Sequence, residues 1–210
     1  MTILCHRHRF IFIAVPKTGS HSIRFALRDL LGPEDEEQVS LFVSRRIDRE
    51  GFRGVQHGHQ TAEEIRGSIG AEVWQQYVSF AVVRNPWERF VSYVAFMMRE
   101  NGTFRADPRG AMHRVLDNPQ RQSRIHLRPQ RDFLVDQAGH CIVNRLCRME
   151  RLQADFDELC RNLALPLIPL TRRNPSEHRH YVDYYDPELV ERIGFLYAED
   201  VAMLGYDFGC

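Results

Sequence analysis

The chain has 210 residues and a formal net charge of zero. Hydrophobic residues make up 43% of it and charged residues 27%, a composition that indicates a single globular domain over residues 1–210 and excludes a disordered or fibrous protein. The neutral balance also excludes a protein that coats nucleic acid through a basic surface, so any anion-binding site must be local.

The cysteines and the apolar segments indicate a cytoplasmic protein. Five cysteines are an odd number, and no Cys-x-x-Cys pair is present, which favours reduced thiols over a disulfide framework. The apolar run from Phe10 to Val15 is too short for a secretory signal or a membrane span, and we expect no transmembrane segment.

The first predicted elements are a strand, a loop and a helix. Residues 10–15 form a continuous, partly β-branched apolar run, which is typical of a strand buried on both faces. The loop PKTGSHS (16–22) follows, and residues 23–31 then have helical spacing until Gly32 and Pro33 end the helix. Residues 33–50 are rich in charge and are expected at the surface.

A second strand is predicted over residues 54–59 and a third over residues 77–83. Between them, Thr61 and Glu64 have the Thr-x-x-Glu spacing of a capping box, which predicts the start of a short helix. After the third strand, Pro86 fits the first turn of a helix that continues to about residue 99.

The second half of the chain begins with a polar stretch, residues 101–131, which predicts long loops with one short helix. Residues 141–143 predict a strand, residues 152–163 an amphipathic helix and residues 187–204 a final helix. Strands that alternate with helices indicate an α/β fold with a central parallel sheet and helices on both faces.

The loop 16–22 has the features of an anion site at the start of a helix. Backbone N–H groups and the helix dipole favour a negative charge there, and Gly19 allows close approach. Lys17 is the single lysine among 28 basic residues, and its compact ammonium can follow a charge as it develops. Hydroxyl donors are supplied by Thr18, Ser20 and Ser22. An ordinary Gly-Ser turn is the alternative interpretation.

The segment RNPWERFVS (84–92) is a second candidate anion site. Arg84 leaves the carboxyl end of a predicted strand, where open α/β sheets bind ligands, and Ser92 follows about two helical turns later. An Arg and a Ser in these positions can reach one phosphate. The alternative is a surface ion pair for Arg84 and simple packing for Ser92.

Together the two segments resemble the sulfotransferases that use 3′-phosphoadenosine 5′-phosphosulfate (PAPS), in particular the group that includes carbohydrate sulfotransferases and bacterial relatives. PKTGSHS is similar to the family's 5′-phosphosulfate loop, and RNPWERFVS is similar to its 3′-phosphate motif. The similarity continues in shorter segments at residues 126–130, 133–134, 184–189, 196–200 and 205–208. Residues 33–53 and 100–122 match poorly.

The resemblance implies a P-loop-NTPase-like three-layer sandwich and transfer of a sulfuryl group from PAPS to a hydroxyl acceptor, with adenosine 3′,5′-bisphosphate as the other product. It favours a carbohydrate acceptor, such as a glycan or a glycolipid, with a small alcohol or phenol as the alternative. Arg84 and Ser92 would hold the 3′-phosphate, with Arg179 in a later loop as a further contact. The residues implied to hold the 5′-phosphosulfate are Lys17, Thr18, Gly19, Ser20, His21 and Ser22. Lys17 suits the charge that develops on the leaving oxygen.

The acceptor hydroxyl needs a general base, and histidine has a suitable pKa. His59 is the first candidate because it stands immediately before the capped helix, where the family often has a histidine, and His57 is the second. A surface or structural role is the alternative for both. His126 and Arg128 either face the acceptor or only order their loop.

Two other classes of function remain open. A P-loop-type phosphotransferase would share the fold, although the loop 16–22 lacks the Gly-x-x-x-x-Gly-Lys order and no strand ends on an obvious Asp for magnesium. A non-catalytic module that binds a nucleotide or a sulfated ligand is the other class. His-x-His pairs at residues 6–8 and 178–180 raise the question of zinc, but their spacing matches no known finger or ribbon, and we expect no metal.

Overall fold

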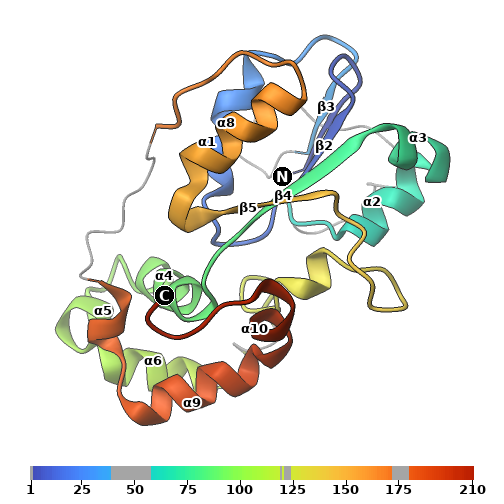
Figure 1. Ribbon diagram of the computed structural model, residues 1–210. Coiled ribbons are helices and arrows are strands. Elements are labelled where there is room, and N and C mark those ends of the chain that lie inside the picture. Colours follow the sequence, from blue (N-terminus) through green and yellow to red (C-terminus); the bar gives the residue numbers. More distant parts are fainter. Residues whose placement is uncertain (1, 39–57, 119, 121–123, 172–179) are drawn as a thin grey trace. The chain divides into compact units, whose positions relative to one another are not determined.

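The computed structural model describes residues 2–38, 58–118, 120, 124–171 and 180–210 (Figure 1). The chain forms two compact units. Unit 1 consists of Met1–Val15, Gly19–Val83 and Asp132–Arg173. Unit 2 consists of Pro16–Thr18, Arg84–Arg131 and Asn174–Cys210. The loop 16–22 is therefore divided, because Thr18 belongs to unit 2 and Gly19 to unit 1.

A five-stranded sheet in the order β3-β1-β2-β4-β5 forms the centre of unit 1. Its strands are β1 (Ile3–Cys5), β2 (Phe10–Ile13), β3 (Glu36–Glu37), β4 (Val78–Val83) and β5 (Arg145–Arg148). The strands β2, β4 and β5 are parallel, which confirms the expected centre of the sheet. One side of the sheet departs from the expected parallel arrangement, because β1 pairs antiparallel with both β2 and β3.

Helices cover both faces of this sheet, which confirms the α/β class. The helices α1 (Ser20–Arg28) and α8 (Leu152–Asn162) lie on one face, and α2 (Ala62–Ile69) and α3 (Ala71–Gln76) lie on the other (Figure 1). Successive side chains of a strand point to opposite faces, and so Phe10, Phe12 and Phe80 all pack toward α1 and α8 in one buried cluster. The finer likeness to P-loop nucleotide-binding proteins stays a prediction.

Local capping signals position the helices that follow the sheet strands. The side chain of Thr61 accepts from the backbone N–H of Glu64, whose carboxylate accepts in turn from Thr61 N–H, so the predicted capping box is confirmed. The helix α4 (Pro86–Met97) begins with Pro86 in its first turn, as expected. Asn85 caps it, because its side-chain oxygen accepts from Trp87 N–H at 3.1 Å.

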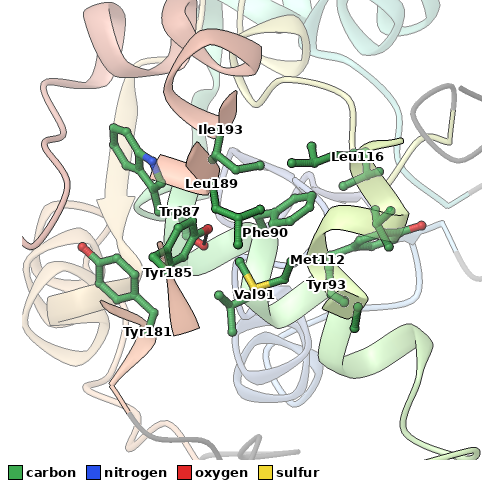
Figure 2. Packing of buried hydrophobic residues seen from close by; sticks show 14 of the residues in the cluster. Trp87, Phe90, Val91, Tyr93, Met112, Leu116, Tyr181, Tyr185, Leu189 and Ile193 are labelled. Carbon is green, nitrogen blue, oxygen red and sulfur yellow. Dashed lines mark hydrogen bonds between the residues drawn. The ribbon is translucent and has the colours of Figure 1, made fainter. Parts of the chain in front are cut away.

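Unit 2 is built around α4, whose apolar face is buried against the other helices of the unit. Figure 2 shows Trp87, Phe90 and Val91 of α4 packed among Leu189 and Ile193. The surrounding elements are α5 (Thr103–Ala106), α6 (Pro108–Leu116), η4 (Tyr181–Tyr184), α9 (Pro187–Leu196) and α10 (Ala198–Leu204). Tyr185 anchors this packing by donating its hydroxyl to Trp87 O at 2.8 Å.

Several predicted elements differ from the observed ones. The described part of the segment 101–131 includes the two helices α5 and α6 where one was expected, because Asp107 caps α6 and Pro108 starts it. Residues 141–143 form no strand, since Cys141 makes only an isolated bridge to Val135 and the strand β5 begins at Arg145. The predicted helix 187–204 is broken at Tyr197 into α9 and α10.

The predicted strand 54–59 falls mainly outside the described residues, and Gly58 to Gln60 are not in a strand. The expectation that residues 33–50 lie at the surface holds for Pro33 and Glu34 but is wrong for Asp35, Glu37 and Gln38, which are buried. Glu37 on β3 is only 4% exposed and accepts hydrogen bonds from Arg24 and Arg28 of α1. A carboxylate buried against two guanidinium groups connects the edge of the sheet to α1.

The five cysteines are free thiols, with Cys5, Cys147 and Cys160 buried and Cys141 and Cys210 exposed. Within the described ranges, no helix has the length and apolar character that a bilayer crossing requires.

We expect Glu37→Leu to lower the free energy of unfolding by about 3–5 kcal/mol, because it leaves the Arg24 guanidinium buried without its counter-charge. Urea unfolding measures this loss. The double variant Arg24→Met with Glu37→Leu should recover most of it, since no buried charge remains. Glu100→Gln, which removes an exposed ion pair with Arg99, is the control and should change stability by less than about 1 kcal/mol. Equal losses in the single and double variants would contradict this account.

Candidate active site

The first half of the loop 16–22 is held inside unit 2 by two arginines. Arg89 donates from Nε to the carbonyl oxygen of Pro16 at 3.0 Å, and Arg84 donates from Nη1 to the carbonyl oxygen of Lys17 at 3.3 Å. Lys17 itself adopts a left-handed backbone conformation with φ 67°, and Thr18 is fully buried. The two sequence motifs thus meet through direct hydrogen bonds.

The ammonium of Lys17 lies against an aromatic ring of α4. Its Nζ is 4.0 Å from the centroid of the Phe96 ring, and the Arg99 guanidinium lies 4.5 Å from the same centroid. The pKa of Lys17 falls to about 8, first because burial removes water from the ammonium and then because of the positive charges of Arg84, Arg99 and Arg89.

One side of α4 carries the groups that contact Arg84 and Lys17. Glu88, Ser92 and Phe96 are spaced four residues apart and so lie on the same side of the helix. Glu88 accepts from Arg84 Nη2 at 2.8 Å, and Phe96 contacts Lys17. Ser92, which is buried, stands between them on this side. Unit 2 therefore gathers four of the predicted donor-binding residues, namely Lys17, Thr18, Arg84 and Ser92.

Arg84 is fixed by its backbone, while its side chain keeps a spare donor. Its backbone N–H donates to Gln130 Oε1 at 2.9 Å, and its carbonyl accepts from Gln130 Nε2 at 2.8 Å. The residue is 7% exposed, and among the described residues its buried Nε has no hydrogen-bond partner. A buried guanidinium N–H without an acceptor is what a site for an anionic oxygen requires.

Arg89 was not predicted as a site residue, yet it organises the surroundings of the loop. Its Nη2 donates to the carbonyl oxygens of His126 and Arg128, and its Nη1 lies 4.0 Å from Asp200 Oδ2. Burial raises the pKa of Asp200, and the Arg89 charge opposes that shift. The available signal in the sequence was a lone Arg on the apolar face of a predicted helix, between Trp87 and Phe90.

The second half of the loop lies in unit 1, where it starts α1. Gly19 is the residue before the helix and has φ 81°, and an added Cβ would come within 2.6 Å of Met149 Sδ. Ser20 is buried and donates its hydroxyl to Val15 O at 2.8 Å, whereas Ser22 donates to Thr171 O at 2.9 Å. His21 is exposed. Only Gly could occupy position 19 without strain.

His59 lies in unit 1 at the carboxyl end of β2. It is 8% exposed, and its Nδ1 lies 2.7 Å from the carbonyl oxygen of Ala14. The next residue along the chain, Val15, has the carbonyl that accepts from Ser20. A carbonyl can only accept, so Nδ1 carries the hydrogen, and in the neutral ring Nε2 is the nitrogen that carries none. Nε2 can therefore accept a proton, as a general base must.

The remaining predicted residues have different surroundings. His126 and Arg128 meet Arg89 through their carbonyl oxygens, and the His126 ring stacks on Tyr93 with a centroid distance of 6.3 Å. His57 and Arg179 lie outside the described residues. Within the part of the chain that is described, no cluster of three or more metal-ligating side chains occurs.

Comparison with known proteins gives one match. A model of the sulfotransferase family matches residues 1–207. No curated protein and no solved structure matches the chain. The match runs through both units and includes both anion motifs. The chain therefore belongs to the sulfotransferase family, whose enzymes transfer sulfuryl groups.

Proposed function

We propose that this protein transfers a sulfuryl group from PAPS to a hydroxyl of a carbohydrate acceptor. The observation that carries the proposal is the hydrogen bond from Arg84 to the carbonyl of Lys17, which joins the two anion motifs within unit 2. PAPS carries anionic groups at the 3′ and 5′ positions of its ribose, so a protein that binds it needs two cationic positions. Arg84 and Lys17 supply these positions.

The residues present fit such a donor. Arg84 has an unused buried N–H at Nε, and Ser92 lies on the same side of α4 as the Glu88 that Arg84 contacts, which supports their assignment to the 3′-phosphate. The 5′-phosphosulfate would meet Lys17 and Thr18, and the resemblance also assigns to it the residues from Gly19 to Ser22, where α1 begins. Arg179 remains the predicted third contact of the 3′-phosphate.

Lys17 has the charge that the reaction needs at its leaving oxygen. Transfer moves negative charge onto the phosphate oxygen that leaves the sulfur, and a nearby cation lowers the barrier. The protein keeps Lys17 largely protonated at neutral pH, since its pKa is about 8. The chain thus offers an ammonium that is charged and already stripped of much of its water.

His59 is the proposed general base. With Nδ1 donating to Ala14 O, the ring presents Nε2 to remove the proton of the acceptor hydroxyl as the sulfuryl group arrives. His57 is the second candidate. His126 and the exposed Arg128 are proposed to contact the acceptor, and an exposed guanidinium suits an acidic glycan.

We further propose that units 1 and 2 act as one catalytic domain over residues 1–210. We place this domain in the cytoplasm and propose that it works without a metal.

Arg84→Ala should weaken the selective recognition of the 3′-phosphate. In the wild type, adenosine 3′,5′-bisphosphate should bind more tightly than AMP, and the variant should reduce this ratio by about tenfold to a hundredfold, because one charge-assisted hydrogen bond is lost. Isothermal titration calorimetry measures both ligands. The control is Arg114→Ala, which removes an exposed arginine of α6 and should leave the ratio unchanged. A wild type that prefers ATP with magnesium would favour a phosphotransferase instead.

Bisphosphate affinity and folding stability should respond to pH in opposite directions. Affinity should fall as the pH rises through about 8, because Lys17 loses its charge there and not near 10.5. Stability should rise between pH 8 and 10.5, because unfolded Lys17 still binds the proton that folded Lys17 has released. Calorimetry and urea unfolding from pH 7 to 10 test both trends against Lys17→Arg, whose guanidinium does not titrate there. Identical affinity profiles for the two proteins would refute this role of Lys17.

His59→Asn should greatly slow transfer while preserving the fold. The Asn amide N–H can still donate to Ala14 O, but no base remains, so the rate should fall about 10²–10⁴-fold. Transfer of labelled sulfate from PAPS to a panel of glycans, alcohols and phenols measures the rate, and bisphosphate affinity should stay unchanged. His113→Asn, in the α6 helix of unit 2, is the control. Bisphosphate binding by a wild type that modifies no acceptor would favour a non-catalytic module.

A further inference from the structure

Phe96 has an unusual setting for an aromatic residue near the surface of unit 2. Its side chain is 41% exposed, yet it is absent from the apolar cluster around which the unit is packed. Two cations lie against its ring instead, the Lys17 ammonium at 4.0 Å and the Arg99 guanidinium at 4.5 Å from the centroid. The ring contacts that its side chain makes are therefore with charged groups.

Lys17 has little else to stabilise its charge. Among the residues that the structure describes, no carboxylate forms an ion pair with its ammonium. The surrounding arginines disfavour the protonated form, and so does burial. The face of an aromatic ring carries partial negative charge and attracts a cation, and the Phe96 ring is the group that provides this attraction.

Both ends of Lys17 are held by the segment that contains α4. Arg84, just before the helix, donates to the Lys17 carbonyl, and Phe96, near its end, contacts the Lys17 ammonium. The position of the side chain is thus defined by contacts at both ends, although the side chain itself is long and has four rotatable bonds.

We propose that Phe96 is a positioning residue that holds the Lys17 ammonium protonated and in place before the donor binds. Before the donor binds, the ring takes the place beside the ammonium that an anionic oxygen of the donor takes later. The ammonium therefore remains charged without a carboxylate, which would compete with the donor. This inference rests on the proposed role of Lys17 as the group that meets the phosphosulfate. It adds Phe96, which neither motif singled out.

The test is the titration of Lys17 in the protein without donor. Because Lys17 is the single lysine of the chain, growth on labelled lysine gives one side-chain Cε signal, whose NMR shift reports protonation directly. Phe96→Leu keeps an apolar side chain but removes the ring and should lower the Lys17 pKa by about half a unit. Phe96→Tyr keeps the ring and should leave the pKa unchanged.

A matched control is available in unit 1. Phe25 is 37% exposed and has the Arg28 guanidinium 4.9 Å from its ring centroid, so Phe25→Leu removes a similar cation–ring contact elsewhere. It should not change the Lys17 titration. A Lys17 pKa that is unchanged or raised in Phe96→Leu overturns the proposal, provided that the melting temperature shows a folded protein. If that variant does not fold, Phe96→Met serves as the replacement without a ring, with the same expected shift.

A second measurement separates this inference from the proposed function. Bisphosphate affinity of Phe96→Leu should fall relative to the wild type by about twofold at pH 8, and less at pH 6.5, where Lys17 is largely protonated in both proteins. If the wild type binds no bisphosphate, the proposed function fails while the titration still decides the role of Phe96. If the wild type binds and Phe96→Leu loses affinity equally at both pH values, the pH-dependent role of Phe96 is refuted.

Discussion

Arg89 is buried within unit 2, and its guanidinium organises the polypeptide around the loop. Its hydrogen bonds reach the carbonyl oxygens of Pro16, His126 and Arg128, which come from two separate segments of the chain. Asp200 supplies the nearby negative charge and also accepts from the backbone N–H groups of Gln130 and Arg131. Without this arginine, three carbonyls would lose a donor and a carboxylate would lose its counter-ion.

The buried pair of Arg89 and Asp200 fixes the positions of the neighbouring backbone groups more than it stabilises the fold. Burial raises the pKa of Asp200 even with Arg89 nearby, which means that keeping the carboxylate charged in the folded state is unfavourable. The side chain of Gln130 connects the same network to Arg84 through two hydrogen bonds with the Arg84 backbone. The position of the proposed phosphate ligand Arg84 and that of the loop carbonyls thus depend on one buried polar network. Such a network is typical of a site in which orientation matters.

Much of the fold could be predicted from local patterns. The apolar runs at β2 and β4, the capping box at Thr61 and the proline at the start of α4 each specify an element through short-range physics. The strands β1 and β3 were missed because they have three and two residues, too few to show a period. The break at Tyr197 was missed because its cause is tertiary: its hydroxyl donates to Leu127 O and its ring lies near Arg89.

The candidate site was predictable to the extent that its residues form contiguous motifs. The sequence pointed to Lys17 and Arg84 separately, but their hydrogen bond depends on the fold of unit 2. The tautomer of His59 likewise follows from a carbonyl at Ala14, distant in sequence. Phe96 lies outside both motifs, and Arg89 lies inside the second motif without having been singled out, because an aromatic residue or an arginine on a helix is common. Only their neighbours in space distinguish them.

The close approach of Met149 to Gly19 has a consequence for how the protein is handled. The thioether of Met149 is half-buried, and its sulfur stands where any side chain at position 19 would be. Oxidation to the sulfoxide would add an oxygen and a strong dipole to that sulfur, against the glycine at which α1 begins. Peroxide would therefore disturb the start of this helix through a residue that belongs to neither anion motif. A methionine sulfoxide reductase would restore the Met149 thioether.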